Sequence, residues 1–413
     1  MSTFKKWVSP SFEYLKVLLK WIVIASVVGT IGGSIGSFFH ICIDIATEQR
    51  TENPWIILLL PIGGLAITFM YQLFKKSGQI STNRVIKSVQ TDENVPFIMV
   101  PLIFISTCIT HLLGGSAGRE GAAIQLGGSL GYNVGRVFKL KEGNMHIIVM
   151  AGICSVFSAL FGTPLTATFF AMEVINVGVW HYASFIPCLL SSIIAFGISS
   201  LFGLKGVHFG ITSVSLSPLL VFQTIILALL CALVGILFCQ TIKKCESIMD
   251  KAFPNPYLRT VFGSLIIIAL TFGLKTFDYN GAGMDVIARA IEGDARYEAF
   301  ILKILFTAIT IAAGFKGGEI VPAFFIGSTF GCVAGQILGI SPSLGAAMGF
   351  VALFCSVVNC PIASTILALE VFGADSVLIM AVVCGVSFMM SGYFGLYETQ
   401  KFAFSKLTED IID

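Results

Sequence analysis

Long apolar segments recur along the whole chain and are separated by short polar or glycine-rich stretches. Their approximate limits are 12–45, 54–74, 95–113, 122–138, 145–161, 164–178, 183–203, 216–241, 259–277, 298–313, 320–340, 344–358, 361–373 and 376–395. A helix needs ~20 residues to cross the ~30 Å hydrocarbon core of a bilayer, so the longer segments predict transmembrane helices. The shorter segments, interrupted by glycine and proline, predict half-helices that end inside the protein, where they line a cavity or a binding site.

The composition supports a membrane protein and excludes a soluble globule. Of the 413 residues, 56% are hydrophobic and only 12% are charged, about half the charged fraction of a soluble domain. The formal net charge of +2 comes without basic patches, so we expect no nucleic-acid partner. The 11 cysteines lie mostly in apolar segments without a CxxC pair, which predicts packing roles and neither a metal site nor a cofactor.

Basic residues near the ends of the segments predict the orientation, because lysine and arginine favour the cytoplasmic side. They are Lys5, Lys6, Lys16 and Lys20 near the N-terminus, and Lys75, Lys76, Arg84 and Lys87 after the second segment. We therefore expect residues 1–11 and the 75–94 loop in the cytoplasm. The charged residues near 245–259 and 276–297 predict two further polar loops.

An internal repeat divides the chain. Five glycines recur 200 residues later, so that Gly114, Gly118, Gly127, Gly131 and Gly135 match Gly314, Gly318, Gly327, Gly331 and Gly335. Gly152 likewise matches Gly349, and the segment from Pro164 to Glu173 matches the one from Pro361 to Glu370.

The repeat predicts two membrane halves, 12–203 and 216–400, joined by a linker at 204–215 and followed by a tail at 401–413. A duplicated bundle places its binding site where the halves meet, near mid-membrane. The sequence leaves open whether the two repeats are parallel or inverted. Glu173 and Glu370 occupy equivalent positions at the ends of two half-helices, where we expect structural roles.

The first candidate site motif reads Gly-Gly-Ser-Ala-Gly-Arg-Glu-Gly over residues 114–121. Glycines that lead into an apolar segment predict a helix N-terminus near Arg119–Gly121, whose free N–H groups attract an anion or a carboxylate. Glu120 lies there, so its carboxylate can occupy the anion site and be displaced or protonated. A glutamate that only caps the helix is the alternative, but an acidic residue inside a membrane is costly enough to favour function.

The second motif reads Gly-Phe-Lys-Gly-Gly-Glu-Ile-Val-Pro over residues 314–322. Pro322 suits the first turn of a helix, and the glycines allow the preceding backbone to wrap a small ligand. Two facing helix N-termini replace the water shell of a small anion without a fixed full charge that would trap it. The two motifs together therefore predict an anion site.

Together with the 164–173 segment, these motifs resemble the signature elements of the CLC family of anion channels and exchangers. The resemblance implies an all-α polytopic membrane protein of two inverted repeats, with tilted and broken helices. It also implies a multi-pass location in the bacterial inner membrane and a homodimer with one pathway in each subunit.

The resemblance further implies roles for individual residues. Glu120 corresponds to the gating and proton-coupling glutamate, with Arg119, Gly121 and Val321 around the external anion site. Deeper in the protein, the backbone N–H groups of Glu319 and Ile320 would bind a central anion. The hydroxyl group of Tyr397 would touch that anion too, unless Tyr397 is simply a buried interfacial residue.

Three departures from the common pattern resemble the fluoride/proton antiporter branch of the family. Val174 stands where chloride exchangers carry an internal proton-relay glutamate, and Glu319 stands where an apolar residue is usual. The chloride-type serine motif is absent from the 77–83 loop, where Ser81, Thr82 and Asn83 are each candidates to face the anion; a plain cytoplasmic loop is the alternative. A structural carboxylate is the alternative for Glu319.

We therefore expect an antiporter that exports fluoride in exchange for protons, with Glu120 carrying the proton and Glu319 supporting proton or anion coupling. A chloride/proton exchanger and a passive anion channel remain alternatives on the same fold. An enzyme is not expected, because no HExxH motif occurs and the 5 histidines are scattered along the chain.

Overall fold

The computed structural model describes residues 2–74, 81–91, 93–211, 216–408 and 410–411. Within these residues the chain is mostly helical, as predicted. The α-helices are α1 Ser2–Glu52, α2 Leu60–Leu73, α3 Thr82–Thr91, α4 Met99–Leu113, α5 Glu120–Val137, α6 Glu142–Phe161, α7 Pro164–Glu173, α8 Phe185–Leu201, α9 Pro218–Ala252, α10 Pro256–Leu274, α11 Met284–Ile291, α12 Ala299–Ala312, α13 Ile320–Ile337, α14 Pro342–Val358, α15 Pro361–Phe372 and α16 Val377–Met390. Two 3₁₀ helices, Pro54–Leu59 and Tyr182–Ser184, and two strands of one short parallel sheet, β1 Asn176–Val177 and β2 Lys401–Phe402, complete the described elements.

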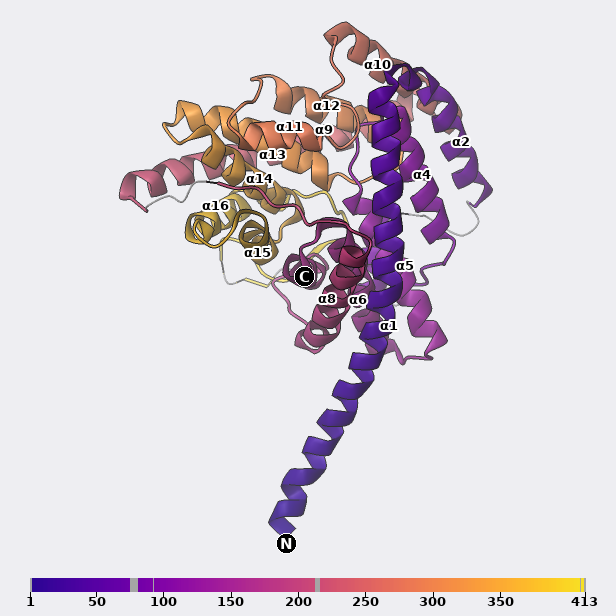
Figure 1. The fold of residues 1–413 in the computed structure, drawn as a ribbon, viewed down its shortest axis with the longest axis vertical. Coiled ribbons are helices and arrows are strands. Elements are labelled where there is room, and N and C mark those ends of the chain that lie inside the picture. The colour runs from indigo at the N-terminus through magenta and orange to yellow at the C-terminus, as the bar shows by residue number, and fades with distance from the viewer. Residues whose placement is uncertain (1, 75–80, 92, 212–215, 409, 412–413) are drawn as a thin grey trace.

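Seven helical segments of the described chain are long and apolar enough to cross a membrane. The longest helix, α1, has 51 residues, which is ~75 Å at 1.5 Å per residue. Figure 1 shows that its N-terminal part extends beyond the rest of the molecule. Shorter apolar helices, among them α4, α12, α14, α15 and α16, lie between these spans. The predicted mixture of full spans and half-helices is therefore confirmed.

Three segments predicted as polar loops contain more helix than expected. The 75–94 segment includes α3, whose Val85, Ile86 and Val89 are buried, and the 276–297 segment includes α11. Because charged residues cover only one face of these amphipathic helices, the charges alone suggested loops. In the third segment, 245–259, α9 continues to Ala252 and α10 begins at Pro256, since lysine and glutamate are good helix formers outside the apolar core.

The two repeats are inverted, as the resemblance implied. Gly118 and Gly318, which occupy equivalent positions in the two repeats, pair in an antiparallel bridge. The equivalent segments of the two halves therefore run in opposite directions where they meet.

The repeated glycines make equivalent contacts in the two halves. Gly127 of α5 packs directly on the backbone of Gly152 in α6, and Gly327 of α13 packs on that of Gly349 in α14. A side chain at any of these positions would overlap the neighbouring backbone, so only glycine allows the helices this close. The repeated glycines thus mark the same helix–helix packing arrangement in both halves.

The half-helices α7 and α15 are capped across the repeats. The carboxylate of Glu370, near the end of α15, accepts N–H bonds of 2.9 Å from Leu165 and 2.7 Å from Thr166 at the start of α7. The carboxylate of Glu173 accepts N–H bonds of 3.2 Å from Ile362 and 2.9 Å from Ala363 at the start of α15. The predicted structural positions at half-helix ends are confirmed, and each glutamate serves the other repeat.

Candidate functional site

The loops before α5 and α13 meet in the interior and bring two helix N-termini together. Gly118 and Gly318 form an antiparallel bridge in which each N–H donates to the other carbonyl at 2.6 Å. Three residues after Gly118, a side chain at Gly121 would lie only 2.7 Å from the Gly318 Cα atom. The predicted facing N-termini are therefore confirmed, and α5 begins at Glu120 and α13 at Ile320.

The carboxylate of Glu120 lies inside this junction. Only 1% of the residue is exposed, and its Oε2 atom accepts the Arg119 N–H at 2.9 Å. The backbone N–H groups of Glu120 itself and of Val321 also face the carboxylate. The acidic group thus occupies a ring of N–H donors drawn from both helix N-termini, an environment that suits a small anion equally well.

A cavity of about 750 Å³, the Asp44 cavity, lies on one side of the junction. It is lined by residues from the end of α1, by Arg119 and Val321, and by the 277–286 segment. Its charged lining residues are Asp44, Glu48, Arg50, Glu52, Arg119, Asp278 and Asp285. This cavity is therefore acidic on balance, with Arg119 as the base beside Glu120.

A second cavity of about 450 Å³, the Tyr397 cavity, lies on the other side. It brings together residues that are far apart in the sequence and that the sequence singled out. These lining residues are Ser81, Thr82, Asn83, Glu319 and Tyr397. Glu120 lines neither of the two cavities described here, but Arg119 and Val321 line the Asp44 cavity and Glu319 lines the Tyr397 cavity.

Tyr397 and Glu319 supply the polar groups of the Tyr397 cavity that lie nearest the junction. Tyr397 is 6% exposed, and its hydroxyl group lacks a hydrogen-bond partner among the described residues. Such an unsatisfied buried hydroxyl is uncommon and costs free energy unless a ligand or water completes it. The Glu319 carboxylate lies beside Gly121, since a Cβ atom there would be 3.3 Å from its Oε2 atom.

The remaining predicted residues lie around this cavity or under the junction. Thr82 accepts a 3.1 Å bond from the Gln125 amide, whereas Asn83 bonds to Thr399. Ile320 and Val321 are buried in the first turn of α13. Residues 77–80 of the loop lie outside the described residues, so of the predicted loop only the part from Ser81 is placed.

Two residues were not identified from sequence. Gln125 lines the Tyr397 cavity, and its Oε1 atom has no partner within the described chain. Lys316 lines the same cavity, and its ammonium group lies 4.7 Å from the centre of the Tyr71 ring. Lys316 stands within the second motif, and Gln125 is a polar residue in the apolar first turns of α5, a signal that could have drawn attention to it.

Val174 lies in an apolar environment next to the half-helix α7. Its side chain is fully buried, and its carbonyl accepts a 3.1 Å bond from the Gln400 amide. The neighbouring carboxylate, Glu173, is engaged in capping α15. Position 174, where the resemblance placed the relay glutamate of chloride exchangers, is therefore filled by an apolar packing residue.

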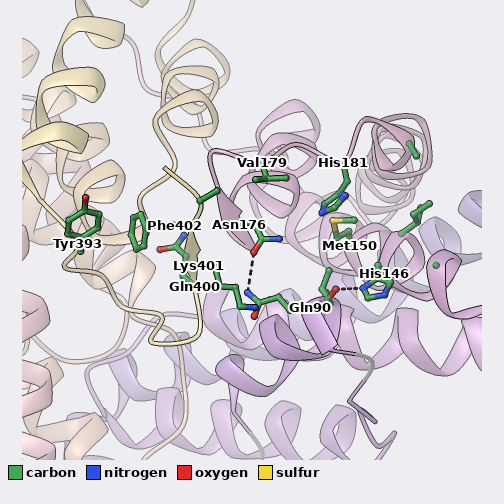
Figure 2. Close-up of a pocket in the computed structure, with 15 residues that line it drawn as sticks. Gln90, His146, Met150, Asn176, Val179, His181, Tyr393, Gln400, Lys401 and Phe402 are labelled. Carbon is green, nitrogen blue, oxygen red and sulfur yellow. Dashed lines mark hydrogen bonds between the residues drawn. The ribbon is translucent and has the colours of Figure 1, made fainter. Parts of the chain in front are cut away.

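A separate cavity of about 1030 Å³ lies where β1 and β2 meet α3 and α6. Figure 2 shows Gln90 reaching toward Asn176, and His146 directed toward the backbone of α3. Gln90 also bonds to the carbonyl groups of Ile175 and Thr399, which ties the end of the second repeat to the first. Neither Glu120, Glu319 nor Tyr397 lines this space, so it is distinct from the candidate site.

Comparisons with known proteins agree with this geometry. A chloride/fluoride channel protein of Pseudomonas syringae pv. tomato is 32% identical over 414 residues, covering 98% of this chain and 91% of the relative. The H(+)/Cl(-) exchange transporter ClcA of Vibrio campbellii is 25% identical and covers 84% of this chain and 81% of its own length.

Solved structures show the same fold. The crystal structure of a CLC-type fluoride/proton antiporter is similar with a TM-score of 0.90 and 31% identity, over 93% of this chain and 98% of that one. A slow cyanobacterial Cl⁻/H⁺ antiporter, 20% identical, shares the fold with a TM-score of 0.76 over 90% of this chain and 94% of that one. The profile of the voltage-gated chloride channel family matches residues 63–392, and the chain therefore belongs to this family, the CLC proteins.

Proposed function

We propose that the protein is a proton-coupled antiporter that exports fluoride in exchange for protons. The observation that carries this proposal is the position of Glu120, whose buried carboxylate lies at the meeting point of two helix N-termini whose neighbouring residues line two cavities. A group that can be charged in one step and neutral in the next is what coupling requires. The similarity to a fluoride/proton antiporter at 31% identity supports fluoride as the anion.

The orientation follows from the basic N-terminal region and the 75–94 segment, which we place in the cytoplasm. The Tyr397 cavity then opens to the cytoplasm, and the Asp44 cavity opens to the outside. Cytoplasmic fluoride would enter past Ser81–Asn83 and reach the hydroxyl group of Tyr397 and the first N–H groups of α13. The acidic Asp44 cavity favours the approach of protons over the return of anions.

In the transport cycle, Glu120 takes a proton from the Asp44 cavity, and its neutral carboxyl group leaves the ring of N–H donors. Fluoride then occupies that ring and leaves to the outside. Fluoride is a strong hydrogen-bond acceptor, so the protonated carboxyl group of Glu120 or Glu319 is a suitable partner for it. Glu120 then releases its proton into the Tyr397 cavity. Its charged carboxylate returns to the ring of N–H donors, which completes the exchange.

The Val174 environment favours fluoride over the chloride/proton alternative. Chloride exchangers of the family carry a second proton-relay glutamate at this position, and here an apolar side chain fills the space. The proton must then travel with Glu120 itself and with groups in the Tyr397 cavity, of which Glu319 is the carboxylate closest to the junction.

We also propose a homodimer with one pathway in each subunit, in the bacterial inner membrane. Glu120, Glu319 and Tyr397 come from one chain, so a single subunit holds all the proposed machinery. Reconstitution at one subunit per vesicle, with efflux measured per vesicle, tests for independent pathways. A pathway that needed both subunits would give non-additive loss when wild-type and inactive subunits are mixed.

The deciding experiment is efflux from proteoliposomes loaded with fluoride or with chloride, followed by ion-selective electrodes while internal pH is recorded. Fast fluoride efflux, slow chloride efflux and simultaneous proton uptake are expected. Comparable chloride efflux would indicate a chloride/proton exchanger, and fluoride movement without protons would indicate a passive channel. Glu120→Gln should abolish proton uptake, whereas Glu48→Gln in the Asp44 cavity should leave it intact.

A further inference from the structure

Arg119 is shared between two carboxylates. Its Nη1 atom lies 3.3 Å from Oδ1 of Asp44, and its Nε atom lies 3.6 Å from Oε1 of Glu120. The third contact of the guanidinium group is a 3.5 Å bond from Nη2 to the Leu160 carbonyl. The Arg119 side chain is only 12% exposed, so its charge needs a close negative partner at every stage of transport.

Asp44 differs from Glu120 in its access to water. Its side chain is 59% exposed and lines the Asp44 cavity. On its other side, Oδ2 lies 3.3 Å from Nε2 of His40, which is 9% exposed and one helical turn earlier in α1. The Asp44 carboxylate therefore touches water, Arg119 and His40 at once, while the Glu120 carboxylate touches only the interior.

We infer that Asp44 is a positioning residue for the proton-coupled step, acting through Arg119. This inference rests on the proposed function of Glu120. When the Glu120 carboxyl group is neutral and leaves the junction, the Arg119 guanidinium loses one of its two partners. Asp44 keeps that charge balanced and holds the guanidinium toward the cavity, which makes protonation of Glu120 less costly. It also prevents an uncompensated Arg119 from retaining the departing anion.

The charged groups around Asp44 come from three parts of the chain. From α1 these are His40, Glu48, Arg50 and Glu52, from the start of α5 they are Arg119 and Glu120, and from the 277–286 segment they are Asp278 and Asp285. Two of them have other recorded partners, since Arg50 donates to the His111 carbonyl and Asp278 pairs with Arg289. Glu48, one turn beyond Asp44, has no recorded contact with Arg119 and is a matched control of equal charge.

The test is the dependence of fluoride efflux on external pH in proteoliposomes. Asp44→Asn removes the negative partner, so Arg119 pairs with Glu120 alone and stabilises its charged form. The external pH of half-maximal efflux should then move by about 0.3–0.7 unit toward acid, the size expected of one partly exposed ion pair. Asp44→Glu should restore the wild-type midpoint, and Glu48→Gln should leave it within about 0.1 unit.

Each other outcome contradicts the inference. An equal shift in Asp44→Asn and Glu48→Gln would mean that only the total charge of the cavity matters. No shift, a shift toward alkaline pH, or a lower rate at every pH without a shift would leave Asp44 with a structural role at most. The wild-type protein is measured in vesicles of the same composition. If it does not exchange fluoride for protons, the proposed function fails independently of the role of Asp44, and the variants are then compared with chloride as the anion.

Discussion

Gly118 and Gly318 donate a backbone hydrogen bond to each other, and this exchange holds the two repeats together at the junction where Glu120 lies. Both bonds are 2.6 Å long. Because the two loops approach this closely, the N-termini of α5 and α13 point into one small volume, and Glu120 can be reached by donors from both.

This contact predicts that Gly318→Ala inactivates the protein. A Cβ atom at Gly318 would lie 3.0 Å from the Cα atom of Gly121 and closer still to its nitrogen, so the backbone must move. Overpacking of this kind costs about 1–3 kcal/mol, and we expect fluoride efflux to fall at least about tenfold. Gly197→Ala in α8 is the control, since nothing lies within 4 Å of a Cβ atom there. Equal efflux from the two variants would show that the close approach is unnecessary.

The carboxylates of Glu370 and Glu173, which cap the starts of α7 and α15, predict that their loss lowers stability without changing the coupling of proton uptake to fluoride efflux. Glu370→Gln and Glu173→Gln weaken charge-assisted bonds to the start of the opposite half-helix, at a cost of about 1–3 kcal/mol each. Glu370 should be the more sensitive, because it also accepts a 2.6 Å bond from the Thr166 hydroxyl group. The measurement is the apparent thermal unfolding midpoint in detergent, with proton uptake per fluoride recorded in parallel. Unchanged stability with lost proton uptake in Glu173→Gln would instead place Glu173 in the proton pathway.

The unpaired hydroxyl group of Tyr397 predicts an effect on the anion alone. Tyr397→Phe removes no recorded hydrogen bond of the described protein, so the unfolding midpoint should stay close to that of the wild type. If the hydroxyl group donates to fluoride, its loss should weaken fluoride binding about tenfold. The concentration dependence of fluoride efflux measures this directly. A weakened fold with unchanged affinity would make Tyr397 a packing residue.

Lys406 predicts a pH dependence of the C-terminal tail. Its ammonium group bonds to Asn359, the Phe388 carbonyl and Ser391, and burial lowers the pKa of Lys406 from the ordinary value of 10.5 to about 8. Between these two pH values the unfolded chain binds more protons than the folded one, so raising the pH stabilises the folded protein. The wild-type unfolding midpoint should therefore rise relative to that of Lys406→Met between about pH 7.5 and about pH 9.5. Lys401→Met, at an exposed lysine, is the control. A difference between the unfolding midpoints of the wild type and Lys406→Met that does not change with pH would contradict this prediction.

Much of the architecture was readable from the sequence, because glycine and proline mark it directly. Pro322 and the glycines before Glu120 and Ile320 indicated where the two helices start. The glycine repeat indicated that the packing of α5 on α6 is repeated by α13 on α14. Inversion of the repeats was not readable from these positions, since residue spacing carries no direction in space. It came from the family resemblance and is visible in the antiparallel pairing of Gly118 with Gly318.

The candidate site was readable in part. Glu120, Glu319 and Tyr397 stand in or near distinctive motifs, and the structure brings them to one junction and one cavity. Asp44 and His40 gave no such signal, because they lie in a long apolar helix about 75 residues before Arg119 in the chain. Only the three-dimensional packing of α1 against α5 places Asp44 beside the guanidinium group.

The antiparallel bridge between the repeats has a consequence for sidedness. Gly118 corresponds to Gly318, so Arg119 corresponds to Glu319 and Glu120 to Ile320. At the first matched position the charge is reversed, and at the second a carboxylate is replaced by a hydrocarbon side chain. Because the two repeats are inverted, the backbone at the junction is nearly the same when viewed from either face of the membrane. Two identical copies would therefore present the same groups to both faces. At the junction, the difference between the two faces of the membrane thus lies in two adjacent pairs of side chains and not in the backbone.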